Sequence, residues 1–407
     1  MKILHTADWH IGKKLHKQEL AEDFELFTKW LCDCIRHHEI DVLLVSGDVF
    51  DLANPSAEAR RQYYKSLLVL RELGCKIILT GGNHDSPAML DAPKHLLKEL
   101  DLHVIGGLPD NLKETLIPIY SGQGNLELII AAIPYLRDAD FKWTDVGNTH
   151  EERVENVRRG IQQVYTSVAE ISQRDYPGVP IIAMGHLFAA GMETSESERD
   201  IQLGNQAAFE ASHFGTHFKY IALGHIHKPQ KVSFSTPTFY SGSPLPLSFS
   251  ERKDHKRVIV IDSRTWESKS IELPAFRKLI RITGTLNELT QKLDALGQPL
   301  DLESLLELEL IEDQYDAHQL YLLDQLVSSF DRPGYRIVKH RAHFKNQLQG
   351  AGDAFSADHQ LEDLKPRDIF LKLIEGNDHD PELRKEILGA FDELLEEYQS
   401  DQPASNR

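Results

Sequence analysis

Cysteine is scarce in this chain of 407 residues, which contains only three. An odd number of cysteines does not make a disulfide framework and is typical of a protein from a reducing compartment. Cys32 and Cys34 lie two positions apart in a helix-like segment, so their side chains point in different directions and make a poor metal pair. We therefore expect these two residues and Cys75 to be structural.

The sequence also lacks any uninterrupted apolar run of about 18 residues, so no transmembrane helix and no membrane partner are expected. Asp8 stands where a signal peptide would continue its apolar stretch. These features predict a cytoplasmic protein. The phosphate-binding loop Gly-x-x-x-x-Gly-Lys-[Ser/Thr] is absent as well, so we expect this chain to bind no ATP and a partner to supply any ATP-driven step.

The chain has fewer basic than acidic residues: 45 Lys and Arg compared with 63 Asp and Glu, which gives a net charge of −18. Phosphate contacts need Lys and Arg, so the total charge argues superficially against a nucleic-acid partner. Total charge says little about a local cleft, however, particularly one that binds metal ions through its own carboxylates. The charge balance therefore does not decide the class of partner.

Five short apolar runs in the sequence each end in side chains that can bind metal ions. Continuous apolar runs of this kind, bounded by turn residues, predict buried strands. The polar residues that follow them are Asp8 and His10; Asp48; Asn83, His84 and Asp85; His186; and His225 and His227. In an open α/β sheet, ligands bind beyond the carboxyl ends of the strands. We therefore expect these residues to form one pocket.

The candidate ligands of this pocket combine carboxylate and amide oxygens with imidazole nitrogens. They are Asp8, His10, Asp48, Asn83, His186, His225 and His227. This set exceeds the needs of one ion but suits two ions that share a bridging carboxylate. Mixed oxygen and imidazole donors fit Mn²⁺, Fe or Zn²⁺, and the absence of cysteine ligands argues against a structural zinc site. Two ions about 3.5–4 Å apart form the arrangement used for phosphoester hydrolysis.

Each motif taken alone has a simpler structural explanation. An Asp after a strand is usually a helix N-cap, and Gly-Asp is often only a turn. A single His beside Gly is more often a satisfied polar residue than a ligand. The repetition of such motifs at equivalent strand ends is what favours the metal site.

The chain changes character after Pro274. Residues 1–273 alternate apolar runs with amphipathic stretches, which is typical of an α/β domain. Residues 274–344 combine strand-like and helix-like patterns and predict a compact α+β unit. Residues 345–365 are polar and punctuated by glycine, as in a linker.

Two amphipathic helices are predicted within residues 366–398, followed by a disordered tail at 399–407. Their apolar faces have nothing local to bury them, which is typical of a module that docks on another protein. The alternative is that the helices pack back onto their own domain.

The order of the strand-end motifs resembles that of calcineurin-like metallophosphoesterases. The matching motifs are Asp8-x-His10, Gly47-Asp48, Gly82-Asn83-His84-Asp85, Gly185-His186 and Gly224-His225-x-His227. The residues around these motifs, together with segments 240–244 and 246–249, resemble one branch of the superfamily more than the others. This branch is that of the DNA double-strand-break-repair nucleases, in its bacterial form. The resemblance implies a four-layer α/β sandwich with a two-metal site, followed by a small α+β capping domain and a helical partner-binding segment.

The resemblance also implies a role for each residue of the cluster. Asp8, His10 and His227 would hold one ion, Asn83, His186 and His225 the other, and Asp48 would bridge the two. His84 would lie near the scissile phosphate and stabilise charge or protonate the leaving oxygen, with Asp85 orienting its ring. Some archaeal and eukaryotic relatives carry a second histidine after the Gly-Asp motif, where this chain has Phe50-Asp51. A role that rests on that histidine cannot be transferred.

The activity implied by the resemblance is that of a metal-dependent DNA nuclease subunit. It would act as a 3′-to-5′ exonuclease on duplex ends and as an endonuclease on hairpins and single strands, with Mn²⁺ as the expected ion. Residues 366–398 would dock on an SbcC-type ATPase, with a homodimer of this chain inside a heterotetramer that is associated with the nucleoid. The alternative is a calcineurin-like phosphodiesterase acting on a small nucleotide or phospholipid. A non-catalytic scaffold is disfavoured because no ligand is missing.

Two further expectations concern residues outside the ligand set. Trp9, which lies between two candidate ligands, either stacks on a base or supports the metal-binding loop. Most of the remaining histidines, including His37, His38, His213 and His217, are expected at the surface.

Overall fold

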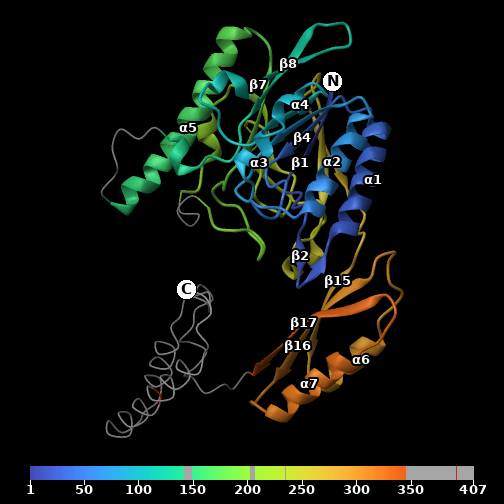
Figure 1. Ribbon diagram of the computed structural model, residues 1–407. Helices are drawn as coiled ribbons and strands as arrows, with labels where there is room; N and C mark the ends of the chain where they lie inside the picture. Colours follow the sequence, from blue (N-terminus) through green and yellow to red (C-terminus); the bar gives the residue numbers. More distant parts are fainter. Residues whose placement is uncertain (142–148, 202–206, 234, 345–390, 392–407) are drawn as a thin grey trace, which may run out of the picture. The chain divides into compact units, whose positions relative to one another are not determined.

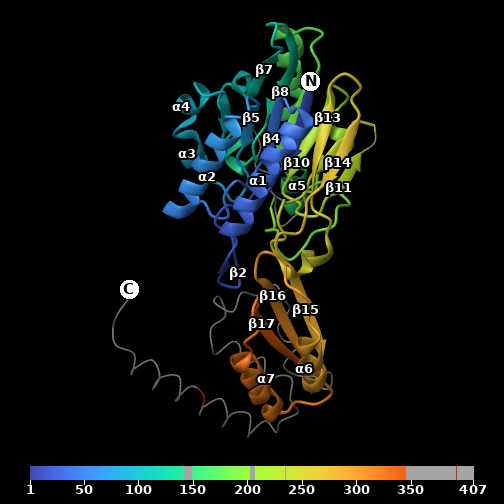
Figure 2. The ribbon, with the colours of Figure 1, turned by 90° about the vertical axis from the view of Figure 1, so that its right-hand side faces the viewer.

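The computed structural model describes residues 1–141, 149–201, 207–233, 235–344 and 391 (Figure 1; Figure 2). These residues divide into two compact units, of which the first comprises 1–280, 298–307 and 332–338 and the second includes 281–297, 308–331 and 339–344. The predicted linker, docking helices and tail lie outside the described residues, apart from Phe391. The domain boundaries expected at residues 273 and 344 remain predictions.

The first unit is built around two six-stranded sheets. In spatial order, the first sheet contains β14 (Ser268–Glu272), β13 (Arg257–Asp262), β1 (Lys2–Thr6), β4 (Val42–Ser46), β5 (Lys76–Thr80) and β6 (Leu102–Ile105). The second contains β11 (Gln230–Ser233), β12 (Thr238–Tyr240), β10 (Phe218–Gly224), β9 (Ile181–His186), β8 (Leu126–Ala132) and β7 (Leu116–Tyr120). The neighbours β1, β4, β5 and β6 are parallel, as are β8, β9, β10 and β12. Each sheet therefore presents a row of strand carboxyl ends at one edge.

Helices cover the outer face of each sheet, which gives four layers (Figure 1). On the first sheet lie α1 (Ala21–His38) and α2 (Ala57–Arg71), and on the second lies α5 (His150–Asp175). The shorter helices are α3 (Pro87–Asp91), α4 (Lys94–Lys98), η1 (Leu112–Thr115), η2 (Asp138–Asp140), η3 (Ala211–Phe214) and η4 (Phe249–Lys253), and a small hairpin pairs β2 (Lys14–Leu15) with β3 (Gln18–Glu19). The four-layer α/β sandwich that the resemblance implies is confirmed.

The continuous apolar runs of the strands are explained by burial on both faces. In β4, Leu43 and Val45 pack in the same cluster as α1 and α2, whereas Val42 and Leu44 pack in the cluster that joins the two sheets. All four side chains are fully buried. A strand between two layers has no face left for water, so the alternating polar pattern of a surface strand is absent.

Later in the chain, a three-stranded sheet contains β15 (Leu279–Gly284), β16 (Ser304–Glu312) and β17 (Tyr335–Phe344) in that order. Its connections contain α6 (Leu286–Asp294) and α7 (Ala317–Ser329). Thr285 caps α6 through a capping box with Glu288, and the Asp316 side chain caps α7 by accepting the His318 N–H.

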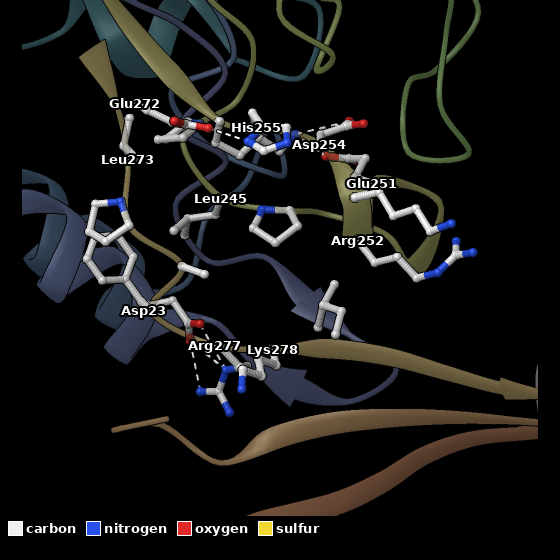
Figure 3. Close-up of a pocket in the computed structure, with 18 of the residues that line it drawn as sticks. Asp23, Leu245, Glu251, Arg252, Asp254, His255, Glu272, Leu273, Arg277 and Lys278 are labelled. Carbon is white, nitrogen blue, oxygen red and sulfur yellow. Dashed lines mark hydrogen bonds and ion pairs between the residues drawn. The ribbon is translucent and has the colours of Figure 1, made fainter. Parts of the chain in front are cut away.

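Arg277, in the segment that precedes β15, is buried in an ion pair with Asp23 of α1. The guanidinium donates to both carboxylate oxygens, with Nε at 2.9 Å from Oδ1 and Nη2 at 2.8 Å from Oδ2. The pair lines one end of a pocket of about 460 Å³ whose wall also includes Leu245 and Glu251 (Figure 3). Such a two-point contact holds the segment before β15 against α1.

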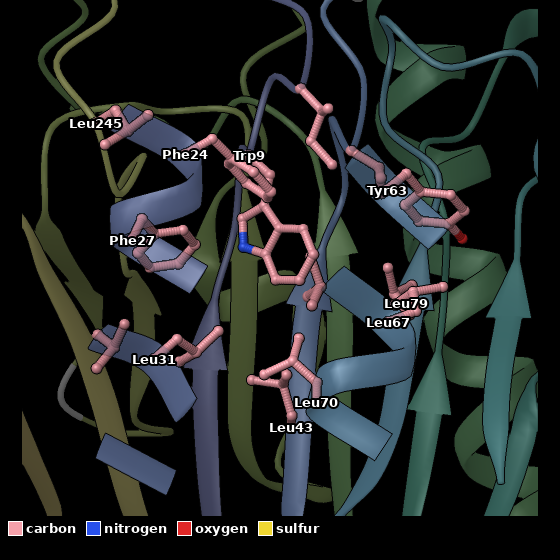
Figure 4. Packing of buried hydrophobic residues seen from close by; sticks show 14 of the residues in the cluster. Trp9, Phe24, Phe27, Leu31, Leu43, Tyr63, Leu67, Leu70, Leu79 and Leu245 are labelled. Atoms are coloured by element: carbon pink, nitrogen blue, oxygen red, sulfur yellow. The ribbon is translucent and has the colours of Figure 1, made fainter. Parts of the chain in front are cut away.

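Trp9 packs inside the core beneath the first metal motif (Figure 4). Its ring centroid lies 5.6 Å from that of Phe24 and 6.1 Å from that of Phe27, and only 1% of the residue is exposed. The indole N–H donates to Thr6 Oγ1 at 3.3 Å. Of the two roles considered for Trp9, support of the loop is therefore correct, and stacking on a base is excluded by burial.

Cys32, Cys34 and Cys75 are buried and form no disulfide. His5, in contrast to the surface position expected for most histidines outside the ligand set, is fully buried between the sheets. Within the described ranges, no helix is both long enough and apolar enough to cross a membrane.

Candidate metal centre

The strand ends that the sequence predicts to share a pocket do so, and they come from both sheets. The carboxyl ends of β1, β4 and β5 belong to the first sheet, and those of β9 and β10 to the second. The sheets meet through polar contacts at this edge. Ser46 Oγ donates to the Ala222 carbonyl at 3.0 Å, and the His225 N–H donates to Asp8 Oδ1 at 2.9 Å.

The backbone bends sharply at the candidate ligands. Asp8, His10 and Asp48 have φ values of 53°, 45° and 41°, and His225 has 103°. Residues other than glycine avoid this region because the Cβ atom crowds the backbone, at a cost of about 1 kcal/mol or more each. Four such residues around one point are typical of a functional site, where the fold holds side chains in positions that the local sequence disfavours.

Two glycines allow the close approach of the loops. A Cβ atom on Gly47 would lie 2.0 Å from His186 Nδ1, and one on Gly224 would lie 1.7 Å from the Ser46 carbonyl oxygen. Gly47 also has φ of 78°. Both positions therefore require glycine, and the two sheets come together at the ligands because no side chain separates them.

Asp48 lies at the centre of the cluster. Its Oδ2 is 3.6 Å from His10 Nε2, 3.4 Å from His186 Nε2 and 4.0 Å from His84 Nε2. His10 and His186 belong to the two different ligand groups implied by the resemblance. A carboxylate between these groups has the position that a bridging ligand requires.

The ligand atoms of Asp8, His10, Asp48 and His227 all lie within 4.8 Å of one another. His10 Nε2 and His227 Nε2 are only 3.1 Å apart and therefore point at a common position. On the other side, Asn83 Oδ1 is 2.8 Å from His186 Nε2 and 3.3 Å from His225 Nδ1. The structure thus brings all seven predicted ligands together in two adjoining groups.

Two polar atoms in the cluster have no hydrogen-bond partner. Asp8 Oδ2 and His225 Nε2 are both buried and unsatisfied. Buried polar atoms are almost always paired, because an unpaired one loses its hydration without compensation. An oxygen and a nitrogen donor left open at a mixed carboxylate–imidazole site fit divalent metal ions.

The ionisation of the cluster is strongly perturbed. Burial raises the pKa of Asp8 to about 7, although the neighbouring His186 and His227 oppose the shift. Burial also disfavours the ionised form of Asp48, but His186 and His10 prevail and hold the pKa of Asp48 well below its usual range. Burial lowers the pKa of His225 far below its ordinary value. Burial also opposes protonation of His186, but Asp48 prevails and raises the pKa of His186 to about 9. The metal-free cluster therefore holds protons on some of its candidate ligands, and binding of an ion would displace them.

The second nitrogen of two ligand rings is held by neighbours that sequence reasoning missed. His10 Nδ1 lies 3.2 Å from Asp51 Oδ1, and His227 Nδ1 lies 2.5 Å from Ser197 Oγ. These contacts leave Nε2 of each ring directed at the cluster. Asp51 was noticed in the sequence only as a departure from relatives, and Ser197 belongs to no motif, so it gave no signal.

His84 lies beside the cluster, but its ring is oriented differently from the prediction. Its Nδ1–H donates to the backbone carbonyl of Asp51 at 2.7 Å, which turns Nε2 towards Asp48. Asp85 instead accepts backbone N–H groups, from Gly82 at 2.8 Å, Phe50 at 2.9 Å and Val49 at 3.0 Å. The expectation that Asp85 orients the His84 ring is therefore wrong, because both of its oxygens are already used. Asp85 fastens the loop after β4 to the loop after β5.

The environment of His84 includes one further charged group. Burial lowers the pKa of His84, and the positive charge of Arg199 acts in the same direction, whereas Asp48 opposes both. Arg199 was not identified from the sequence, because an exposed arginine in a polar loop is not distinctive.

Most of the chain matches known protein families. Residues 1–229 match the family of calcineurin-like phosphoesterases, and residues 275–378 match a family described as type 5 capsule protein repressor C-terminal domain. SbcD, the corresponding component of the nuclease SbcCD of Escherichia coli K12, is 32% identical over 304 residues, which are 72% of this chain and 74% of that protein. The proteins of the same name from Rhodobacter capsulatus and Bacillus subtilis are 35% and 30% identical, over 74% and 79% of this chain and 76% and 82% of their own lengths.

Proposed function

Because this chain belongs to the calcineurin-like phosphoesterase family, we propose that it is the metal-dependent nuclease subunit of an SbcCD-type complex. Relatives named as the SbcD component of the nuclease SbcCD align with about three quarters of its length. The observation that carries the proposal is the position of Asp48, a buried carboxylate between two groups of oxygen and nitrogen ligands. The reaction is hydrolysis of DNA phosphodiester bonds, as a 3′-to-5′ exonuclease on duplex ends and an endonuclease on hairpins and single strands.

Two divalent ions fit the donor set. Asp8, His10 and His227 would hold one, Asn83, His186 and His225 the other, and Asp48 would contact both. When bound, such ions activate water and neutralise the charge of the phosphate. Mn²⁺ is the ion we propose, as the family resemblance implies; the donor set, with oxygen and imidazole ligands and no thiolate, suits it as it does Fe and Zn²⁺.

The chain's own residues position the substrate around these ligands. His84 keeps a proton on Nδ1 through the Asp51 carbonyl and turns Nε2 towards the cluster. In its protonated form, which the neighbouring Asp48 carboxylate favours, the ring also carries a proton on Nε2 and can stabilise charge on the phosphate or protonate the leaving 3′ oxygen. Asp85 holds the two loops that present Asp48 and His84, so the distance between ligand and acid is set by backbone hydrogen bonds.

The proposed partners follow from the relatives and from exposed apolar surface. The protein would dock on an SbcC-type ATPase through residues 366–398, since this sequence contains no phosphate-binding loop of its own. A homodimer is supported by α2, where Tyr64, Leu68 and Val69 are 36%, 52% and 38% exposed. The complex would act in the cytoplasm, on the DNA of the nucleoid, in end processing, repair and recombination.

The proposal is tested by incubating the purified full chain with linear duplex DNA and Mn²⁺, with and without its ATPase partner and ATP. We expect Mn²⁺-dependent release of nucleotides that chelation stops. Hydrolysis of a small phosphodiester without any cleavage of DNA would contradict the nuclease assignment. It would favour instead a phosphodiesterase for a small nucleotide or phospholipid.

A further inference from the structure

The position after the Gly-Asp motif supplies negative rather than positive charge to the site. Asp51 Oδ1 lies 3.2 Å from His10 Nδ1 and 3.1 Å from Lys13 Nζ. Burial works against its ionisation, but these two neighbours hold the pKa of Asp51 far below its usual range. The carboxylate neutralises Lys13, so this corner offers no free cation to a phosphate bound near His84.

A different segment, residues 195–199, contacts the candidate ligand His227. Ser197 Oγ is 2.5 Å from His227 Nδ1, and Glu198 Oε1 accepts the His227 N–H at 2.8 Å. Two successive residues of this loop therefore hydrogen-bond to one candidate ligand, Ser197 to its ring and Glu198 to its backbone. The ring of His227 is in turn 4.9 Å from that of His10, which is 4.7 Å from that of His84.

The loop is braced by a buried ion pair. The Ser197 hydroxyl donates to Glu251, which is 1% exposed and which also accepts from Lys256 Nζ at 2.6 Å. Lys256 donates as well to the His227 carbonyl at 3.0 Å. A charge-assisted network of this kind holds the loop rigidly, because breaking it would leave a buried charge unpaired.

Arg199 follows these anchors directly and extends into solvent. It has no hydrogen bond or ion pair with any residue that the structure describes. Its positive charge acts with burial to lower the pKa of His84. The preceding carboxylate forms no ion pair with Arg199: Glu198 Oε1 accepts the His227 N–H, and Oε2 accepts the Ser195 N–H. Among the described residues its donors have no partner, and a planar guanidinium of this kind is suited to bind two oxygens of a phosphate at once.

We propose that Arg199 contacts the non-bridging oxygens of the scissile phosphate and supplies the positive charge that Asp51 cannot provide. This assignment rests on the proposed phosphodiesterase function and names a residue of that site. Ser197 and Glu198 hold the loop on His227 and so fix the position of the Arg199 backbone relative to the candidate ligands. Negative charge that develops on the phosphate would then be stabilised by a cation that is already positioned.

The test compares Arg199→Gln and Arg199→Lys with the wild type and with Arg264→Gln, an exposed arginine whose side chain has no site contact. Each full-length protein is assayed with Mn²⁺ on linear duplex DNA and on bis(p-nitrophenyl) phosphate, and Mn²⁺ affinity is measured by calorimetry. We expect Arg199→Gln to lower kcat/KM about 100-fold on both substrates, as for loss of one oxyanion-stabilising donor. Arg199→Lys should restore part of the rate, and Mn²⁺ affinity should stay within about twofold.

Four results would overturn the assignment. Normal kinetics of Arg199→Gln on both substrates would show that the guanidinium does not touch the phosphate. A loss confined to DNA would place Arg199 on a phosphate away from the cleaved bond. A fall in Mn²⁺ affinity matching the fall in rate would mean that Arg199 acts only through the ligands. Inactivity of the wild type and Arg264→Gln on both substrates would contradict the proposed function itself, and this assignment with it.

Discussion

The Nδ1 atom of His84 lies 2.7 Å from the backbone carbonyl oxygen of Asp51, while the side chain of the same aspartate lies 3.2 Å from His10 Nδ1. One residue therefore orients both the proposed acid and a proposed metal ligand, through different atoms. The backbone contact survives any substitution of the side chain, so the two functions can be separated by mutation.

Asp51→Asn should weaken metal binding more than it disturbs His84. The amide cannot accept the His10 proton with the strength of a carboxylate, and loss of such a partner typically lowers metal affinity about 10- to 100-fold. Titration calorimetry with Mn²⁺ measures the effect, with Asp33→Asn on the exposed face of α1 as control. Equal Mn²⁺ affinities for Asp51→Asn and the control would contradict this role.

His84→Ala should give the opposite pattern. Removal of the imidazole should lower the cleavage rate at least about 100-fold, which is the usual contribution of a positioned acid. The candidate ligands are untouched, so Mn²⁺ affinity should be retained. A variant that cuts DNA at the normal rate would show that His84 has no part in the chemistry.

Asp85→Asn should destabilise the protein although Asp85 contacts no proposed ligand side chain. Its two oxygens accept three backbone N–H groups, and an amide would turn an NH₂ group towards one of them. An unsatisfied buried donor costs about 1–3 kcal/mol. Urea unfolding of the metal-free protein measures this cost; a midpoint equal to that of the wild type would mean that the clamp between the loops is not needed.

Metal binding should stabilise the fold measurably. Asp8 Oδ2 and His225 Nε2 are buried without partners, and an ion that binds only the folded chain adds about 2.7 kcal/mol at 100 times its Kd. The melting temperature should therefore rise with Mn²⁺ and fall again with chelator. Asp48→Asn should lose most of this response, and a full Mn²⁺ shift in that variant would argue against a shared ligand.

His5 should make the fold acid-sensitive independently of the metal site. Burial lowers the pKa of His5 to about 3, while its backbone contact to Leu223 opposes the shift. Between pH 6.5 and about 3 the unfolded chain therefore binds a proton that the folded chain does not. Stability should be intact above pH 6.5 and fall as the pH drops, by up to about 1.4 kcal/mol per unit for this one group.

The measurement for His5 is urea unfolding of the metal-free protein from pH 7 to 4. His5→Gln should flatten the profile, whereas His37→Gln at the exposed end of α1 should not. Parallel profiles for His5→Gln and the wild type would show that this ring does not carry the effect. The structural cost of the substitution appears separately, as a lower stability at pH 7.

Local patterns in the sequence were sufficient to predict an α/β domain and one pocket of strand-end residues, whereas the four-layer sandwich was implied by the resemblance to calcineurin-like metallophosphoesterases. Apolar runs with Asp, Asn or His at their ends mark strands and their carboxyl edges without any knowledge of distant contacts. These patterns do not show which strands belong to which sheet. They therefore could not show that β9 and β10 lie in a different sheet from β1.

The supporting residues were missed for a related reason. Ser197 contacts the His227 ring, Lys256 donates to the His227 carbonyl, and Glu251 accepts from both Ser197 and Lys256. None of the three belongs to a periodic pattern. The role of Asp85 was predicted wrongly because neighbours in sequence were assumed to be partners in space. The turn after β5 instead directs this carboxylate at the backbone of the loop after β4.

The absence of a side chain at Gly224 has a mechanical consequence. A methyl group there would collide with the Ser46 carbonyl, so the spacing of the two sheets is limited by backbone against backbone. Since Asp8, His10, Asp48 and Asn83 are attached to one sheet and His186, His225 and His227 to the other, that spacing also governs the gap between the two halves of the cluster. Gly224→Ala would therefore increase the distance between the candidate ligands on the first sheet and those on the second, although none of these residues is itself replaced.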